Sequence, residues 1–259
     1  MSGNNNRGIV VQEREKHLLR ELAVMRLVDR EQAKCVADFR STTRANRRLR
    51  ALTDAGLLRR FFLGTNGGGR KALYAHSVRG ANLVQVPYRG PRRSEDKSLV
   101  ADYFVIHQLH INRLYCILKY QPIPIENARF LRWESFYEPV DPARVLIPDG
   151  YVEIAACERT VAAFLEVDLG HERGSVWPKK VTNYLRYAAS GEFAKHFRQI
   201  QFRVLVVTNS DRRMHSLRAA TLKLTPKIFW FTTFDAIARD GFWVPVWFRP
   251  EGDAALPLL

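Results

Sequence analysis

The chain has 259 residues, a formal net charge of +15 and 46% hydrophobic residues. This length suits one large domain or two small ones, and the hydrophobic content excludes a globally disordered chain. The charge is unevenly distributed: residues 1–98 contain 21 Lys and Arg against 9 Asp and Glu, and the remainder contains 20 against 17. Basic charge concentrated in the first third indicates a polyanion partner, most often nucleic acid. The alternative is a solvated basic surface.

Cysteine usage and hydropathy exclude several other classes. Cys35, Cys116 and Cys157 are far apart and form no CxxC pair, so neither a zinc site nor a disulfide framework is indicated, and we expect buried free thiols. No apolar run approaches the roughly 20 residues needed to span a bilayer. The polar N-terminus lacks the apolar core of a signal peptide. We therefore expect a cytoplasmic protein without a membrane partner.

The basic third begins with three predicted helices. Apolar residues recur at helical spacing over 12–25. Asp29 is a suitable N-cap for a short helix over 30–37, and Ser41 for a longer one over 42–55. The spacing and the caps together predict three consecutive helices.

The third of these helices has the composition of a DNA-reading helix. Ala45, Leu49 and Leu52 share one face, which leaves the other faces polar and basic. Thr and Asn side chains can reach base edges, and Arg can pair with guanine or with phosphate. The predicted DNA-binding residues of this segment are Ser41, Thr42, Thr43, Arg44, Asn46, Arg47, Arg48 and Arg50.

A β-hairpin is predicted next, with strands over 57–62 and 70–74 and a glycine turn over 66–69. Three helices followed by a hairpin is the order of a winged helix-turn-helix, and the segment resembles winged-helix DNA-binding domains generally. We expect this domain to span residues 8–91. The hairpin adds cations suited to the sugar-phosphate backbone, namely Arg59, Arg60, Arg70 and Lys71. A winged helix used as a protein-interaction module is the alternative.

A linker-like composition with Pro, Gly and a charged run places a domain boundary near residue 92, and the second domain is expected over 92–250. Its pattern predicts the order αβββαβ with further αβ units, which is an α/β (α+β) class with a mixed sheet. The predicted helices and strands are a helix over 99–118, strands over 128–133, 145–157 and 160–168, a helix over 176–189, a strand over 200–208, a helix over 211–220 and a strand over 227–231.

Carboxylates lie at or near the ends of two consecutive predicted strands in this domain. Asp149 follows Pro148 on one strand, and Glu166 and Asp168 end the next. The helix that follows carries Lys180 and, one turn later, Tyr184. Acidic side chains at strand ends beside a lysine are what a site for a divalent metal and a phosphodiester needs.

The order of these elements, with their acids, resembles the PD-(D/E)XK nuclease superfamily. The chain also contains a set of short motifs, which are His107-x-Leu109-x-x-Asn112, Trp133-x-Ser135, Pro148-Asp149-Gly150-Tyr151, the run from Phe164 to Gly170, Lys180-x-x-x-Tyr184, and Val206-Val207-Thr208 with Arg212 beyond it. In their order and spacing these motifs resemble the replication-relaxation family of plasmid and mobile-element proteins. That family also places a winged helix ahead of the nuclease-like domain.

The resemblance implies that Asp149 and Glu166 are metal-binding acids. The superfamily's lysine should stand two residues after the glutamate, but Asp168 occupies that position. Two interpretations follow. In one, Lys180 supplies the charge, Asp168 is an additional metal ligand, Tyr184 holds phosphate and Mg²⁺ is the cofactor. In the other, catalysis is lost and the acids are kept for structure.

The sequence thus predicts a DNA-binding protein of a plasmid or mobile element that acts in DNA replication, relaxation or transfer and binds duplex DNA through a winged helix. One alternative is a metal-dependent endonuclease targeted by that winged helix. Another is a transcriptional or copy-number regulator that dimerises through its C-terminal domain. The expected partners are double-stranded DNA, a second copy of the chain, and replication or transfer proteins.

Overall fold

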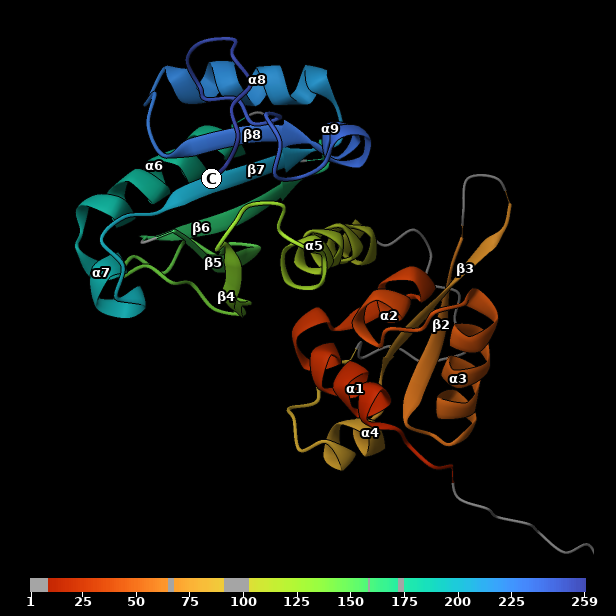
Figure 1. Cartoon of the computed structure of the whole chain (residues 1–259). Coiled ribbons are helices and arrows are strands. Elements are labelled where there is room, and N and C mark those ends of the chain that lie inside the picture. Colours follow the sequence, from red (N-terminus) through yellow and green to blue (C-terminus); the bar gives the residue numbers. More distant parts are fainter. Residues whose placement is uncertain (1–8, 65–67, 91–102, 158, 172–174) are drawn as a thin grey trace, which may run out of the picture. The chain divides into compact units, whose positions relative to one another are not determined.

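The structure is a computed structural model that describes residues 9–64, 68–90, 103–157, 159–171 and 175–259. The chain divides into two compact units, Met1–Tyr120 (unit 1) and Gln121–Leu259 (unit 2) (Figure 1). Helices and strands occur in both units, and the larger sheet contains parallel and antiparallel pairs. The expected mixed α/β class with a mixed sheet is confirmed.

Unit 1 begins with three helices close to their predicted bounds. These are α1 (Glu13–Met25), α2 (Arg30–Val36) and α3 (Thr42–Asp54). The predicted caps of α2 and α3 are confirmed. The Asp29 carboxylate accepts a hydrogen bond from the backbone N of Gln32 at 2.8 Å, and the Ser41 hydroxyl accepts one from the backbone N of Arg44 at 3.2 Å. Local capping chemistry therefore fixes where these helices begin.

A small antiparallel sheet completes this part of unit 1, with strand order β1-β3-β2. The predicted hairpin is confirmed as β2 (Leu58–Gly64) and β3 (Arg70–His76), although residues 65–67 of its turn lie outside the described residues. β1 (Leu27–Asp29) and α4 (Val78–Leu83) were not predicted. β1 has three residues, which is too short for an alternating pattern to be recognised.

The helix α5 (Tyr103–Tyr120) belongs to unit 1, although we expected it to open the second domain. Its backbone carbonyl at Leu109 accepts a hydrogen bond from the Gln32 side chain at 2.8 Å. The side-chain amide of Asn112 donates to the carbonyls of Met25 at 3.0 Å and Leu27 at 2.6 Å. The boundary placed near residue 92 lies outside the described residues and stays a prediction.

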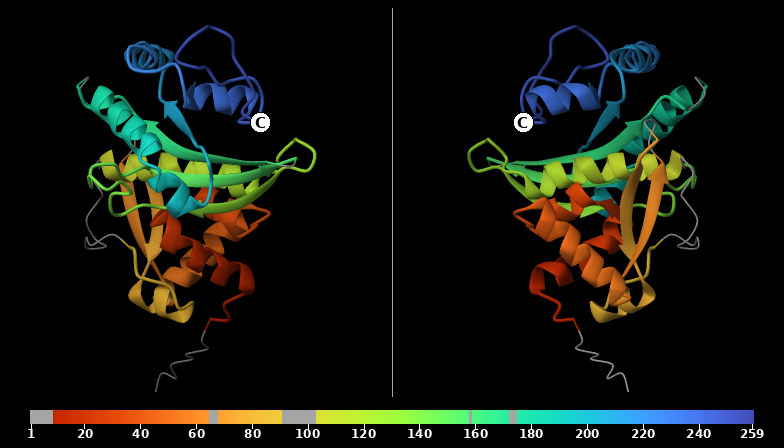
Figure 2. Two further views of the ribbon diagram at one scale, coloured as in Figure 1. Left: turned by 90° about the vertical axis from the view of Figure 1, so that its left-hand side faces the viewer. Right: turned by 90° about the vertical axis from the view of Figure 1, so that its right-hand side faces the viewer.

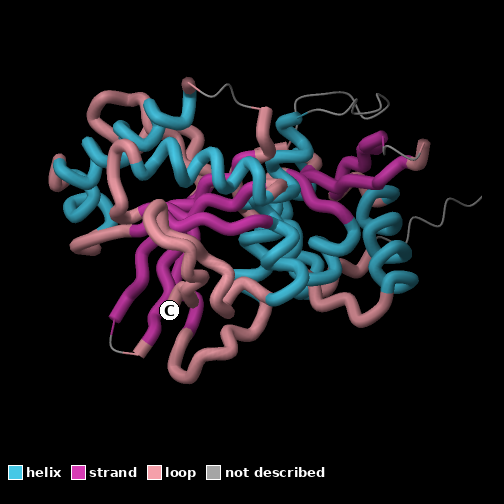
Figure 3. Tube along the Cα trace, turned by 90° about the horizontal axis from the view of Figure 1, so that it is seen from above, coloured by secondary structure: helices cyan, strands magenta, loops and turns pink. Residues whose placement is uncertain are grey.

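Unit 2 is built on a five-stranded mixed sheet with the order β4-β5-β6-β7-β8 (Figure 3, strands in magenta). β4, β5 and β6 pair antiparallel, the last two as a hairpin (green in Figure 2), whereas β6, β7 and β8 pair parallel. The strands are β4 (Arg129–Glu134), β5 (Gly150–Ala156), β6 (Arg159–Asp168), β7 (Arg203–Thr208) and β8 (Phe229–Thr233).

Three helices bury one face of this sheet in an aromatic core. They are α6 (Val176–Ala189), α7 (Glu192–Phe197) and α8 (Asp211–Leu222), and a short α9 (Phe234–Asp240) follows β8. Phe164 on β6 is fully buried within this core. Because successive side chains of a strand point to opposite faces, Glu166 and Asp168 lie on the same face as Phe164, toward these helices.

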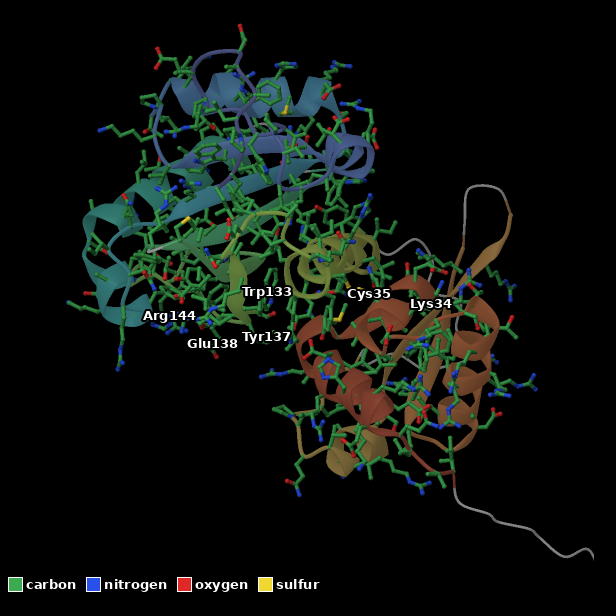
Figure 4. All side chains as sticks on the ribbon, in the orientation of Figure 1. Lys34, Cys35, Trp133, Tyr137, Glu138 and Arg144 are labelled. Atoms are coloured by element: carbon green, nitrogen blue, oxygen red, sulfur yellow. The ribbon has the colours of Figure 1, made fainter. Side chains whose placement is uncertain are left out.

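Two expectations for unit 2 and the cysteines need correction. β5 begins at Gly150 and not at residue 145. Beyond β8, Phe248 forms a bridge to Phe231 at the edge of the sheet. All three cysteines are free, but Cys157 is exposed and Cys35 is half-buried on α2 (labelled in Figure 4). No helix among the described residues is long and apolar enough to cross a membrane.

Candidate functional site

The helix α3 presents its polar residues to solvent and its apolar residues to the core of unit 1. Ala45, Leu49 and Leu52 are fully buried. This buried stripe fixes the rotation of the helix, because turning it would expose all three side chains. The residues that consequently face outward are Thr43, Arg44, Asn46, Arg47 and Arg50, with Ser41 exposed at the cap and Thr42 half-buried.

Arg48 is the exception among the predicted DNA-binding arginines of α3. Its guanidinium donates two hydrogen bonds to the carboxylate of Glu15 on α1, one of them at 2.6 Å, and a third to the carbonyl of Val10 at 2.9 Å. Glu15 is fully buried, and its hydrogen bond raises the pKa of Arg48. A paired, hydrogen-bonded charge of this kind joins α1 to α3 and stabilises unit 1.

Glu15 was not predicted to be a buried, paired acid, although its position in the sequence indicates that it is. It stands in phase with Leu18, Leu19 and Leu22 on the buried face of α1. An acid at such a position needs a partner, because an unpaired buried carboxylate is costly. The partner could not be identified, since Arg48 lies 33 residues away in the chain.

The four predicted hairpin cations lie in different environments. Arg59 donates to the Tyr88 hydroxyl at 2.8 Å and lies 4.9 Å from the Phe61 ring centroid, whereas Arg60 lies 5.2 Å from the Phe62 centroid. Arg70 is exposed. Lys71 pairs with Asp29 at 2.5 Å.

In unit 2 the structure brings four of the five predicted catalytic residues together around Glu166. The Lys180 ammonium donates to Glu166 Oε2 at 2.6 Å, and the Tyr184 hydroxyl donates to Glu166 Oε1. Lys180 and Tyr184 are one turn apart on α6, so both reach the same point on β6. The Asp149 carboxylate accepts from the backbone N of Val167 at 2.7 Å, which places it beside the same strand.

Burial dominates the electrostatics of this cluster. Glu166 is 1% exposed, and burial raises its pKa to about 7. The Lys180 ammonium opposes the shift, and the Asp149 carboxylate adds to it. Burial and the Glu166 carboxylate also raise the pKa of Tyr184 well above its usual value, so the phenol remains a hydrogen-bond donor.

Asp168, the fifth predicted catalytic residue, has a different partner. Arg213 on α8 donates from Nε to Oδ1 at 2.9 Å and from Nη2 to Oδ2 at 2.7 Å. The backbone N of Gly170 adds a hydrogen bond to Oδ1 at 2.7 Å. Asp168 is 5% exposed, so this bidentate pair neutralises a buried charge. Sequence reasoning missed Arg213, which stands 45 residues from Asp168.

These acids do not fit Mg²⁺ in their present arrangement. Both carboxylate oxygens of Glu166 accept from Lys180 or Tyr184, and both oxygens of Asp168 accept from Arg213. Among the described residues no group of three or more His, Cys, Asp or Glu side chains could hold a metal ion. A hard cation requires several free oxygen ligands, which this cluster does not offer.

Comparison with known proteins identifies the family. The family model described as replication-relaxation matches residues 19–201, which is more than half of the chain. The chain belongs to the replication-relaxation family. No curated protein and no solved structure matches it. The family indicates a role in the replication or relaxation of plasmid or mobile-element DNA.

The region that the replication-relaxation model matches runs from α1 to α7 and includes α3 and the Glu166 cluster. It also contains two motifs that meet in space. Trp133 on β4 (labelled in Figure 4) donates to the Ser135 hydroxyl at 2.9 Å, and a Cβ built at Gly150 would lie 2.3 Å from its indole. Only glycine fits at this position without a shift of the indole, which explains why residue 150 is a glycine. Arg213 lies beyond the matched residues.

Proposed function

We propose that this chain binds duplex DNA through α3 and the β2–β3 hairpin, in the manner of a winged helix-turn-helix, during replication or relaxation of plasmid or mobile-element DNA. The observation that carries the proposal is the outward row of arginine, asparagine and threonine on α3, oriented by its buried apolar stripe. Among the described residues, Arg44 and Arg47 have no ion-pair partner, so their charges are available to phosphate.

The parts of this surface would have different tasks. A recognition helix in the major groove reads base edges with residues such as Thr43 and Asn46, and arginines beside them contact phosphate or guanine. Arg50, whose side chain is 80% exposed, pairs only loosely with Asp54 at 3.8 Å. The exposed hairpin cation Arg70 would contact the sugar-phosphate backbone of the DNA. We assign Arg48 no DNA contact, because its guanidinium is committed to Glu15.

The test is the salt dependence of duplex binding by the full chain, with Arg44→Gln/Arg47→Gln compared with wild type. Each lost phosphate contact lowers the slope of log affinity against log salt by about 0.9, so the double variant should lose about 2. The matched control is Arg20→Gln/Arg186→Gln, which removes the same charge from exposed positions outside α3 and the hairpin. Equal slopes for wild type and the α3 variant would contradict the proposal.

We further propose that unit 2 acts as a scaffold and not as a nuclease. Its β4, β5, β6, α6 and β7 follow the order of a PD-(D/E)XK core, and Asp149, Glu166 and Lys180 converge as that ancestry suggests. Both oxygens of the central carboxylate are nevertheless occupied by Lys180 and Tyr184. The cluster then serves to fasten α6 to the sheet.

A nicking assay separates the scaffold from an endonuclease. Supercoiled plasmid is incubated with the full chain and Mg²⁺ or Mn²⁺, and wild type is compared with Glu166→Gln, which keeps the shape and removes the charge. The scaffold predicts no difference between the two proteins. If wild type nicks the plasmid and Glu166→Gln does not, the chain is a metal-dependent endonuclease instead.

A further inference from the structure

Unit 2 contains a pocket of about 350 Å³ at the end of the sheet where β6, β7 and β8 begin. This is the opposite end of β6 from Glu166 and Asp168. Four cations line it, and its described lining contains no carboxylate. These cations are Arg159, Arg203, Lys227 and Arg249.

The topology explains why the cations meet. Arg159 is the first residue of β6, Arg203 is the first residue of β7, and Lys227 stands two residues before β8. The three strands are parallel neighbours, so their beginnings lie at one edge of the sheet. Arg249 joins them from the segment that follows the bridge between Phe231 and Phe248.

Trp230 on β8 forms a rigid platform for two of these guanidinium groups. The Cζ of Arg203 lies 4.7 Å from the Trp230 ring centroid, and that of Arg249 lies 4.9 Å from it. Arg203 also donates to the carbonyl of Leu258, and Arg249 donates to the carbonyl of Pro226 at 3.2 Å. Contacts of this kind orient the two guanidinium groups before any ligand arrives.

The charges in this pocket repel one another. Burial, together with the neighbouring charges of Arg159 and Arg249, lowers the pKa of Arg203. The Nε of Arg249 is buried and has no hydrogen-bond partner among the described residues. A cluster of like charges with a buried donor that lacks an acceptor is stabilised by an anion that offers several oxygens.

We propose that this pocket binds the phosphate groups of a nucleotide or of a nucleic-acid strand. Guanidinium groups pair bidentately with phosphate oxygens, and the exposed Arg159 and Lys227 add charge at the entrance. Pockets of about 300–1,000 Å³ accommodate small ligands of nucleotide size. The site is separate from the DNA contact proposed for α3, because all its residues belong to unit 2.

The first test measures binding of inorganic pyrophosphate to the full chain by isothermal titration calorimetry. The test variant is Arg159→Gln/Lys227→Gln, because both side chains are exposed and have no ion-pair partner among the described residues. The control is Arg186→Gln/Arg212→Gln, which removes the same charge from exposed positions that do not line the pocket. Circular dichroism and thermal melting confirm that each variant is folded.

The expected result is binding by wild type and by the control with dissociation constants within about twofold, and binding at least about tenfold weaker by the test variant. Either of two results would overturn the site. One is no heat of binding by folded wild type at millimolar pyrophosphate. The other is an equal loss of affinity in the test variant and in the control.

A second arm distinguishes the two sources of phosphate. It compares a deoxynucleoside monophosphate with a short single-stranded oligothymidylate, in an Arg44→Gln/Arg47→Gln background that weakens the contact proposed for α3. If the oligonucleotide binds more tightly than the nucleotide, and Arg159→Gln/Lys227→Gln abolishes this binding, the pocket is a site for a nucleic-acid strand. If both ligands bind with equal affinity, and the same variant abolishes their binding, the pocket is a site for a free nucleotide. If the variant leaves the affinity for both ligands unchanged, the proposed pocket is rejected.

Discussion

The two ends of the parallel strands in unit 2 differ in how their charges are compensated. At the carboxyl-terminal end of β6, Glu166 pairs with Lys180, and Asp168 pairs with Arg213. At the amino-terminal end, Arg159 and the other pocket cations have no carboxylate among the described lining residues. One end satisfies its charges internally, and the other accumulates like charge beside a cavity.

Charged residues in a sequence therefore do not by themselves identify a binding or catalytic site. The acids of β6 attract attention in the sequence, because acids inside apolar strands are rare. In the structure each acid is the centre of a closed hydrogen-bond network. The basic end is unremarkable in the sequence, yet it leaves binding capacity unused. Removing one partner of a buried ion pair at the acidic end should therefore destabilise unit 2, whereas removing an exposed pocket cation at the basic end should not.

The largest effect is expected from Arg213→Ala. It leaves the buried Asp168 carboxylate without its bidentate partner, and breaking a buried pair from one side costs about 3–5 kcal/mol in the free energy of unfolding. Urea denaturation followed by circular dichroism measures the change. Arg212→Ala, at the exposed neighbouring position, should change stability by no more than about 0.5 kcal/mol. Similar values for the two variants would show that Asp168 does not depend on Arg213.

The next largest effect is the dependence of the free energy of unfolding on pH. The pKa of Glu166 is raised from 4.5 to about 7, so the folded state retains a proton that the unfolded chain has already lost within this window. The free energy of unfolding should therefore fall as pH rises from 4.5 to about 7 and be constant above it. At 1.36 kcal/mol per pKa unit, a shift in this direction is worth on the order of a few kcal/mol.

Urea titrations of wild type and Glu166→Gln between pH 5 and pH 8, with EDTA present, measure this dependence, because the glutamine cannot titrate. The difference in unfolding free energy between the two proteins should change across the window. A difference that is constant with pH would contradict the raised pKa.

A smaller effect is expected from Tyr184→Phe. The variant keeps the ring in the aromatic core and removes only the hydroxyl that donates to Glu166. The loss of one buried hydrogen bond costs about 1–2 kcal/mol. Thermal melting provides the measurement, with Tyr137→Phe as an exposed control. An unchanged melting temperature for Tyr184→Phe would exclude a fastening role for this hydroxyl.

The smallest effect is expected at the basic end. Arg159→Gln/Lys227→Gln should leave the free energy of unfolding within about 0.5 kcal/mol of wild type or raise it, because exposed like charges contribute repulsion and no pairing. Urea denaturation at low and high salt detects this, since salt screens the repulsion and should bring the two proteins together. A clear destabilisation would show that these cations have structural partners and would weaken the contrast between the two ends.

Local patterns in the sequence were sufficient to predict most of the helices and strands. Periodicity and caps located α1, α2 and α3, because Asp29 and Ser41 act through backbone groups three residues away. The hairpin followed from two short strands and a glycine turn. β1 and α4 were missed, since elements of this length carry too little periodicity to be recognised.

The candidate sites were harder to predict from the sequence than the fold, because the residues that pair with their charged side chains are distant in the chain. Lys180 and Tyr184 could be placed near Glu166, because α6 follows β6 at once. Arg213 could not be assigned to Asp168, nor Arg48 to Glu15, because those pairs depend on tertiary packing. The basic pocket was missed for the same reason. Arg159, Arg203 and Lys227 stand singly before apolar runs, and the parallel order of β6, β7 and β8 brings them together. Arg249 joins them through the segment that follows the bridge between Phe231 and Phe248.

Two adjacent arginines on α3 test the proposed DNA contact most directly. Fluorescence anisotropy with a labelled duplex and thermal melting are measured for Arg47→Gln and Arg48→Gln in the full chain. Arg47 is exposed, so its variant should weaken DNA binding several-fold and leave the melting temperature unchanged. Arg48 supports the buried Glu15, so its variant should lower the melting temperature and leave the affinity of the folded protein almost unchanged. Unaltered DNA affinity in Arg47→Gln, or an equal loss in both variants, would contradict the account.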